Sequence, residues 1–253
     1  MLTFSEAQLM AWITPLLWPF IRVLALFTTA PVLSQRNVPM RIKVSLAFLV
    51  TVCAQASLPE MPPVALDSVQ AAMVVIQQVL IGVTLGFAAR IVFAAIEFAG
   101  ELVGLQMGLN YAGFFDPTSG SQGTAVGSFF GATVSWLFII INGHLLLIMA
   151  LVQSFHAFPV GPEPFAFLRA LQPQVWGAEI FKLGLWIALP MITMLLFVNL
   201  VLGVISRVSQ QMNIFAIGFP ITLGVGLLGV LLTLPMMQAP FTMALEQMLA
   251  YFQ

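Results

Sequence analysis

The sequence predicts an all-α, polytopic membrane protein built from helical hairpins with broken helices. Hydrophobic residues make up 60% of the 253 residues, charged residues only 7%, and the mean hydropathy is +1.05. Soluble domains usually contain about 25% charged residues, so this chain has too few polar side chains to cover a globule. It is long enough for several crossings of about 20 apolar residues each. The net charge of −1 gives no indication of a polyanionic partner.

Prolines and polar breaks divide the chain into six apolar segments. Their approximate bounds are residues 7–30, 44–58, 69 to beyond 90, 123–152, 180–205 and 214–234. The first contains Pro15 and Pro19, and the second is short for a full crossing. A proline-rich link, FPVGPEPFAFLRALQP, separates the fourth from the fifth. We expect these segments to form one domain over residues 1–253.

The C-terminal tail carries an amphipathic pattern. In APFTMALEQMLAYFQ, the residues Phe241, Leu245, Met248 and Phe252 recur at helical spacing. Such a stripe is typical of a helix with one apolar face. We therefore expect a C-terminal amphipathic helix that lies on a membrane or on a partner.

A polar, glycine-rich stretch, GLNYAGFFDPTSGSQG over residues 108–123, interrupts the apolar sequence. Non-helical backbone at membrane depth is tolerated only where protein or water surrounds it. Gly113 gives flexibility, and bulky aromatic side chains follow it closely, so one interpretation is a constriction or plug. The other is an exposed turn, which physical reasoning alone favours. The candidate residues for a plug are Gly108, Asn110, Tyr111, Gly113, Phe114, Phe115, Asp116 and Pro117.

Glycines recur every four residues on both sides of this stretch. Small residues at this spacing let another helix backbone approach closely in apolar surroundings. Glycine costs about 1 kcal/mol relative to alanine inside a helix, so the repeats call for a packing reason. Alternatively, the two glycines that border the stretch belong to the loop itself. The glycines of the two stripes are Gly100, Gly104 and Gly108 before the stretch, and Gly123, Gly127 and Gly131 after it.

The first stripe extends backwards and includes charged residues. If the helix is unbroken, Gly82, Gly86, Arg90, Glu97 and Glu101 lie with the later glycines within an arc of about 100°. A charge that faces lipid costs about 2.5–3.5 kcal/mol, so this face should meet protein or water. Two interpretations stay open. The face packs inside one bundle with Arg90 paired to Glu97, or it meets other subunits or an aqueous path.

Arg207 lies between the fifth and sixth segments. It either pairs with an acidic residue of a neighbouring subunit or forms a basic turn at a membrane face.

Three stretches of the chain resemble a known family. They are the opening LLWPFIRVLALFTTAPVLSQRNVPMRIKVSLAFLV, the loop GLNYAGFFDP, and SRVSQQMNIFAIGFP over residues 206–220. Together they resemble the FliR family of flagellar biosynthesis proteins, a component of the type III export gate, over nearly the whole chain. QMNIFAIGFP favours the flagellar branch over the virulence injectisome branch.

The resemblance implies a function and partners. Family members join FliP and FliQ in a helical, ring-like, hetero-oligomeric channel, and unfolded flagellar subunits pass through its centre. Residues 108–123 would then plug the closed pore with Tyr111, Phe114 and Phe115, beside a methionine ring of FliP. FlhB and FlhA are further expected partners. The expected location is the bacterial inner membrane, in the flagellar basal body.

We expect neither enzyme activity nor a cofactor. His144 and His156 have no companion ligand at metal-binding spacing. The sequence contains no phosphate-binding loop, HExxH motif or nucleophile elbow. The alternative function is a secondary transporter for a small solute or ion, because broken helices and isolated charges also occur in that class. We find no convincing repeat between the two halves to support it.

Overall fold

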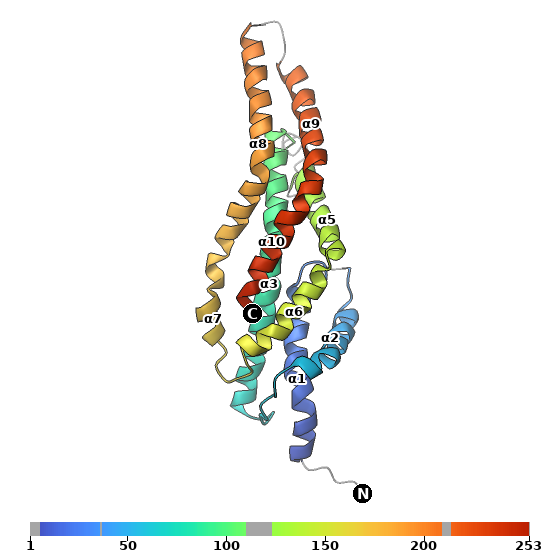
Figure 1. Cartoon of the computed structure of the whole chain (residues 1–253), viewed down its shortest axis with the longest axis vertical. Helices are drawn as coiled ribbons and strands as arrows, with labels where there is room; N and C mark the ends of the chain where they lie inside the picture. Colours follow the sequence, from blue (N-terminus) through green and yellow to red (C-terminus); the bar gives the residue numbers. More distant parts are fainter. Residues whose placement is uncertain (1–5, 36, 110–122, 209–213, 253) are drawn as a thin grey trace, which may run out of the picture. The chain divides into compact units, whose positions relative to one another are not determined.

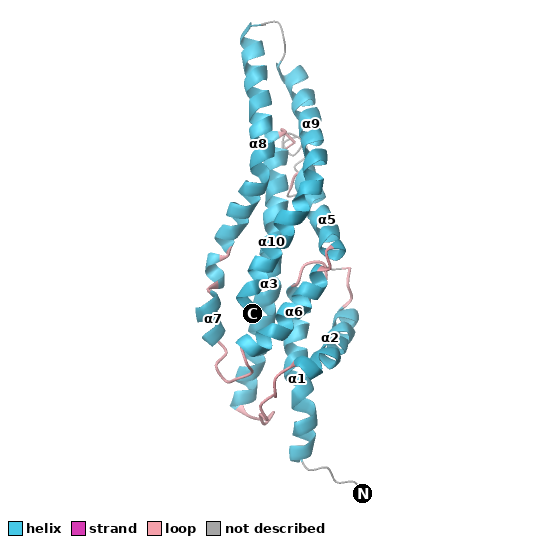
Figure 2. Cartoon of the chain, viewed as in Figure 1, coloured by secondary structure: helices cyan, strands magenta, loops and turns pink. Residues whose placement is uncertain are grey.

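A computed structural model describes residues 6–35, 37–109, 123–208 and 214–252 (Figure 1). Over these ranges the regular structure is helical, and no strand is present (Figure 2). The elements are α1 (Glu6–Thr29), α2 (Met40–Ala54), η1 (Gln55–Ser57), α3 (Val69–Gln106), α5 (Ala125–Ile140), α6 (Gly143–Ala157), α7 (Ala166–Leu171), η2 (Pro173–Val175), α8 (Gly177–Val208), α9 (Ile214–Thr233), η3 (Leu234–Met237), α10 (Gln238–Leu249) and η4 (Ala250–Phe252).

Several of these helices are long and apolar enough to cross a membrane. Within the described residues there are four, or up to five if the bent pair α5–α6 counts as one span. The four are Met40–Ser57, Val69–Gln106, Pro173–Val208 and Ile217–Phe252. The predicted all-α, polytopic membrane fold is therefore confirmed.

The fourth apolar segment, residues 123–152, contains all of α5 and most of α6. α5 and α6 are bent by 68° at the break between them. The break lies at Asn142, whose φ of 58° places it in the left-handed region. Asparagine is one of the few residues that visit this region readily, because its short polar side chain can bond locally. The apolar segment over residues 123–152 is therefore a broken helix pair, and the sequence did not locate its break at Asn142.

The chain forms two compact units. Unit 1 comprises Met1–Ile91, Asn142–Trp176 and Leu245–Gln253, and unit 2 comprises Val92–Ile141 and Gly177–Ala244. One dividing point lies inside α3, which is unbroken over 38 residues. The single-domain organisation stays a prediction.

In unit 1, α3 approaches α1 closely at two glycines. A Cβ atom at Gly82 would lie 2.8 Å from the Cβ of Ala25, and one at Gly86 would lie 2.9 Å from the backbone nitrogen of Ala30. Real Cβ atoms do not come this close to such neighbours. Only glycine therefore allows this helix contact without a shift of the backbone.

Unit 1 also encloses a charged side chain. Arg22 is fully buried, and its Nε donates to Oε1 of Gln78 at 2.7 Å. Its Nη1 donates to the backbone oxygen and the hydroxyl of Ser154, at 2.8 and 3.0 Å. Its Nη2 donates to the backbone oxygen of Phe158 at 2.9 Å, and its Cζ lies 3.8 Å from the ring centroid of Phe155. These five residues, which we call the Arg22 cluster, join α1, α3 and the end of α6.

In unit 2, α8 and α9 run side by side as a hairpin (Figure 1). The buried residues of α8 follow one stripe at a spacing of three or four, as expected for a helix with one packed face. They are Gly184, Ala188, Met191 and Leu195. From residue 196 to residue 208, α8 has no buried side chain.

The C-terminal tail is helical as expected, but its apolar face is covered by the chain itself. Phe241, Leu245 and Phe252 are fully buried, and Met248 is 6% exposed. The Phe252 ring lies 6.5 Å from the ring of Phe158 in an edge-on arrangement. The prediction that this face lies on a membrane or a partner was therefore wrong. The spacing identified the face but not the surface that covers it.

Candidate functional site

The candidate site is the region where α3 ends and α5 begins. α3 ends in a Schellman arrangement around Gly108, whose φ is 81°. The backbone N–H of Gly108 donates to the oxygen of Leu105 at 3.0 Å, and that of Leu109 donates to Gly104 at 3.1 Å. These two bonds satisfy carbonyls that the helix end would leave unpaired. Gly108 is thus required here by its backbone conformation.

α5 begins with a capped N-terminus that is tied to α3. The hydroxyl of Thr124 accepts a bond from the backbone nitrogen of Gly127 at 3.0 Å, as an N-cap residue does. The backbone nitrogen of Thr124 itself donates to both carboxylate oxygens of Glu101, at 3.0 and 2.8 Å. A carboxylate is also favoured at the positive end of a helix dipole. Glu101 therefore links α3 to the first residue before α5.

α3 and α5 come close enough for backbone contact. A Cβ atom at Gly100 would lie 2.9 Å from the Cα of Gly127, and one at Gly104 would lie 2.6 Å from the Cβ of Thr124. Both glycines are buried. The two helices can approach this closely because α3 carries no side chain at either position.

Gly123, which precedes α5, and Gly127 and Gly131 within it make room for two carboxylates of α3. A Cβ atom at Gly127 would lie 2.6 Å from Cδ of Glu101, and one at Gly123 would lie 2.6 Å from its Oε1. Likewise, a Cβ atom at Gly131 would lie 2.9 Å from Oε1 of Glu97. The second glycine stripe therefore faces charged side chains as well as backbone, which the spacing alone did not indicate.

The charged residues on α3 lie at the rim of the packed face. Relative to Gly82, the packed glycines of α3 fall at about 0–40°, whereas Arg90 and Glu97 fall at about 60–80°. Both charged side chains are exposed, and Glu101 is half-buried. Their pairing with each other stays a prediction. Arg207, at the end of α8, is also exposed, and its pairing with a neighbour stays a prediction as well.

The middle of the predicted plug lies outside the described residues. This applies to the following candidates: Asn110, Tyr111, Gly113, Phe114, Phe115, Asp116 and Pro117. The structure places the two ends of the stretch, at Gly108 and Gly123, but not these residues. Their role stays a prediction.

Sequence reasoning missed Thr124, although a signal was present. A threonine directly before an apolar run is a common N-cap, because its hydroxyl accepts a bond from a free backbone N–H of the first turn. It also missed the partner of Glu101, for which the sequence predicted only a buried or inter-subunit charge. That partner is a backbone group 23 positions away, and no residue type marks it.

Long apolar helices, a sharply broken helix pair and glycine-mediated helix contacts define a polytopic, all-α membrane protein. Residues 13–248 match the family model described as bacterial export proteins, family 1. Relatives of this chain include the flagellar biosynthetic proteins FliR of three bacteria. That of Pectobacterium carotovorum subsp. carotovorum is 44% identical over 93% of this chain and 90% of its own length, and that of Escherichia coli (strain K12) is 43% identical over 95% and 92%. That of Bacillus subtilis (strain 168) is 31% identical over 81% and 80%.

The chain belongs to the FliR family of flagellar biosynthetic proteins, within bacterial export proteins, family 1. It is a membrane component of the flagellar export apparatus.

Proposed function

We propose that this chain is a structural and gating subunit of the flagellar type III protein export channel. In this role, residues 108–123 contribute a plug to the closed pore through which unfolded flagellar subunits pass. The aromatic side chains of Tyr111, Phe114 and Phe115 block the opening. The partners in the channel are FliP and FliQ, with FlhB and FlhA close by, and the assembly lies in the bacterial inner membrane.

The observation that carries this proposal is the anchoring of both ends of the stretch. The chain leaves α3 at the Gly108 cap and returns at Thr124, whose backbone nitrogen is bonded to Glu101 of the same helix. A segment that begins and ends on one helix can be held across an opening without a separate domain. The glycine contacts of α3 with α5 support this, because they keep the two anchor points close together.

The experiment compares three forms of the assembled complex in planar lipid bilayers. The first is the natural sequence, and the second lacks residues 111–120. In the third, the same residues are replaced by a glycine–serine segment of equal length, which preserves the connection but removes the bulky side chains. We expect both variants to co-purify with the other subunits and to conduct small ions in the closed state.

The equal-length variant separates plugging from assembly. Conductance that rises in both variants assigns the block to the side chains of residues 111–120. If both complexes assemble and stay as tight as the natural one, the plug role is excluded.

A further inference from the structure

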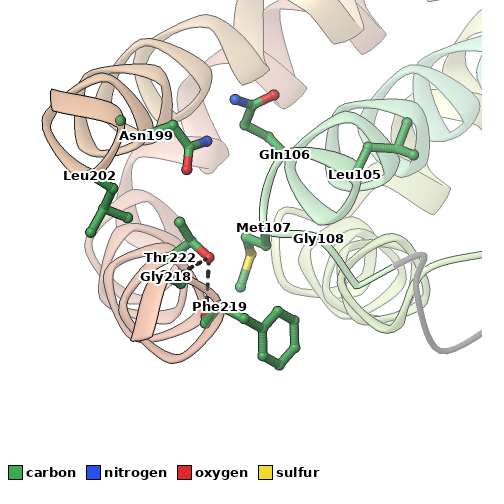
Figure 3. A pocket seen from close by; sticks show the side chains of 10 residues that line it. Leu105, Gln106, Met107, Gly108, Asn199, Leu202, Gly218, Phe219 and Thr222 are labelled. Carbon is green, nitrogen blue, oxygen red and sulfur yellow. Dashed lines mark hydrogen bonds between the residues drawn. The ribbon is translucent and has the colours of Figure 1, made fainter. Parts of the chain in front are cut away.

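A pocket with polar groups lies in unit 2, where the end of α3 meets α8 and α9. Its volume is about 350 Å³. Residues 105–108 of α3 and the following turn line one side, and residues of α8 and α9 line the others. Figure 3 shows the carboxamides of Gln106 and Asn199 projecting from α3 and α8 into the space between these helices.

The two carboxamides differ from the other polar groups of this region. The hydroxyls of Thr193, Ser206 and Thr222 each donate to a backbone oxygen three or four positions earlier in their own helix. Among the described residues, neither the Gln106 nor the Asn199 side chain has a hydrogen-bond partner. Each carboxamide offers two donors and one acceptor oxygen. The pocket therefore contains unused donors and acceptors at two positions.

Asn199 lies in a long apolar part of α8. Between Lys182 and Arg207, the sequence of α8 contains no charged residue and no other asparagine or glutamine. A polar side chain in such an apolar helix is costly unless it faces protein or water and finds a partner. The described residues provide no hydrogen-bond partner for it, so its partner lies outside them.

A glycine on the same wall leaves open space. Gly203 lines the pocket, and a Cβ atom there would meet nothing within 4 Å. Glycine inside a helix costs about 1 kcal/mol relative to alanine. At Gly104 this cost allows close packing against Thr124, but at Gly203 no described residue occupies the space. Another backbone can approach here.

We propose that this pocket binds the main chain of an extended polypeptide, with the carboxamides of Gln106 and Asn199 bonded to its peptide groups. The inference rests on the proposed export function and names the recognition chemistry for the exported chain. Carboxamides match the N–H and C=O groups of any residue, so the contact does not depend on the cargo sequence. An unfolded chain of varied composition is the ligand that this chemistry suits.

Other occupants match the pocket less well. Lipid acyl chains have no donors or acceptors, so they would leave both carboxamides unsatisfied. The backbone groups of a partner helix are already bonded within that helix, so only its side chains could reach the carboxamides. An extended chain exposes its own N–H and C=O groups and needs external partners for them.

The test is photo-crosslinking during export. A flagellar subunit fused to a tightly folded domain is used as the probe, because it stalls inside the channel. The photoreactive residue p-benzoylphenylalanine replaces Gly203, where there is room for it. The same replacement at Leu232, which is 71% exposed and does not line the pocket, is the negative control. Replacement at Phe115 reports passage through the proposed plug.

We expect the stalled subunit to crosslink at Gly203 and not at Leu232. The double variant Gln106→Leu with Asn199→Leu should lower the Gly203 crosslink by about tenfold, because two hydrogen bonds are lost. The exchanged pair Gln106→Asn with Asn199→Gln retains both carboxamides and should keep most of the signal. Co-purification of the complex is measured for each variant, so that loss of assembly is recognised.

The outcomes are distinguishable. Crosslinking to the subunit at Phe115 but not at Gly203 overturns this inference and leaves the export function intact. Capture of another export component at Gly203, or a crosslink that the double leucine variant does not weaken, overturns it as well. Absence of the subunit at both positions overturns the inference together with the proposed function.

Discussion

In the Arg22 cluster, three helical elements are joined by one long charged side chain, whereas in the α3–α5 contact two helices meet where side chains are missing. The cluster depends on atoms that are present, because the guanidinium donates four hydrogen bonds to groups on α3 and at the end of α6. The α3–α5 contact depends on atoms that are absent, because a Cβ at Gly100 or Gly104 would collide with α5 or its cap. The two regions should therefore fail in opposite ways. The first is damaged by removal of atoms, and the second by their addition.

The largest effect is expected where atoms are removed from the Arg22 cluster. Arg22→Met deletes the donors and leaves Oε1 of Gln78 and the oxygen of Phe158 without their bonds. An acceptor left unpaired in a buried or half-buried site costs about 1–3 kcal/mol, so we expect the free energy of unfolding to fall by about 3 kcal/mol. Denaturant unfolding of the purified chain in detergent, followed by tryptophan fluorescence, measures it.

Arg169→Met is the matched control for this change, because Arg169 lies exposed on α7. It should shift the free energy of unfolding by no more than about 0.5 kcal/mol. Equal effects of the two variants would show that the hydrogen bonds of Arg22 do not hold the cluster together.

The second-largest effect is expected when larger side chains are introduced into the α3–α5 contact. Gly104→Leu would push against Thr124, and Gly127→Leu would push against the Glu101 carboxylate. Overpacking of this kind costs about 1–3 kcal/mol per site, and it would also displace the anchored end of the plug segment. We expect the double variant to lose co-purification with the other export components. Normal recovery of the complex would show that the glycine stripes are not required for packing.

Features that depend on local sequence patterns could be predicted from the sequence. Apolar runs and glycine spacing are local patterns, so they indicated most of the long helices and the glycines that lie between α3 and α5. The break at Asn142 was missed, although Asn142–Gly143 is a dipeptide that often marks a turn. The long apolar run around it outweighed that signal.

Contacts between distant residues could not be predicted. Arg22 has no acidic residue at helical spacing, and its partners lie 56 and 132 positions away or more. Glu101 also has a distant partner, the backbone nitrogen of Thr124, which is the residue before α5. The spacing of α10 predicted an apolar face, but the side chains that cover this face, such as Phe93 and Phe158, come from other elements. A periodic pattern identifies a face and leaves its neighbour undefined.

The smallest expected effect is an increase in the free energy of unfolding. It distinguishes a glycine on an open helix surface from a glycine in a close helix contact. A Cβ atom at Gly224 in α9 would meet nothing within 4 Å, whereas one at Gly127 would lie 2.6 Å from Cδ of Glu101. Gly224→Ala should therefore raise the free energy of unfolding of the isolated chain by about 0.5–1 kcal/mol, because alanine is the better helix former. Gly127→Ala, the same chemical change, should lower it. Both are measured in the detergent assay used for Arg22. If the two variants shift the free energy of unfolding in the same direction, helix propensity rather than close packing governs both positions. Gly127 would then not be a packing glycine of the α3–α5 contact.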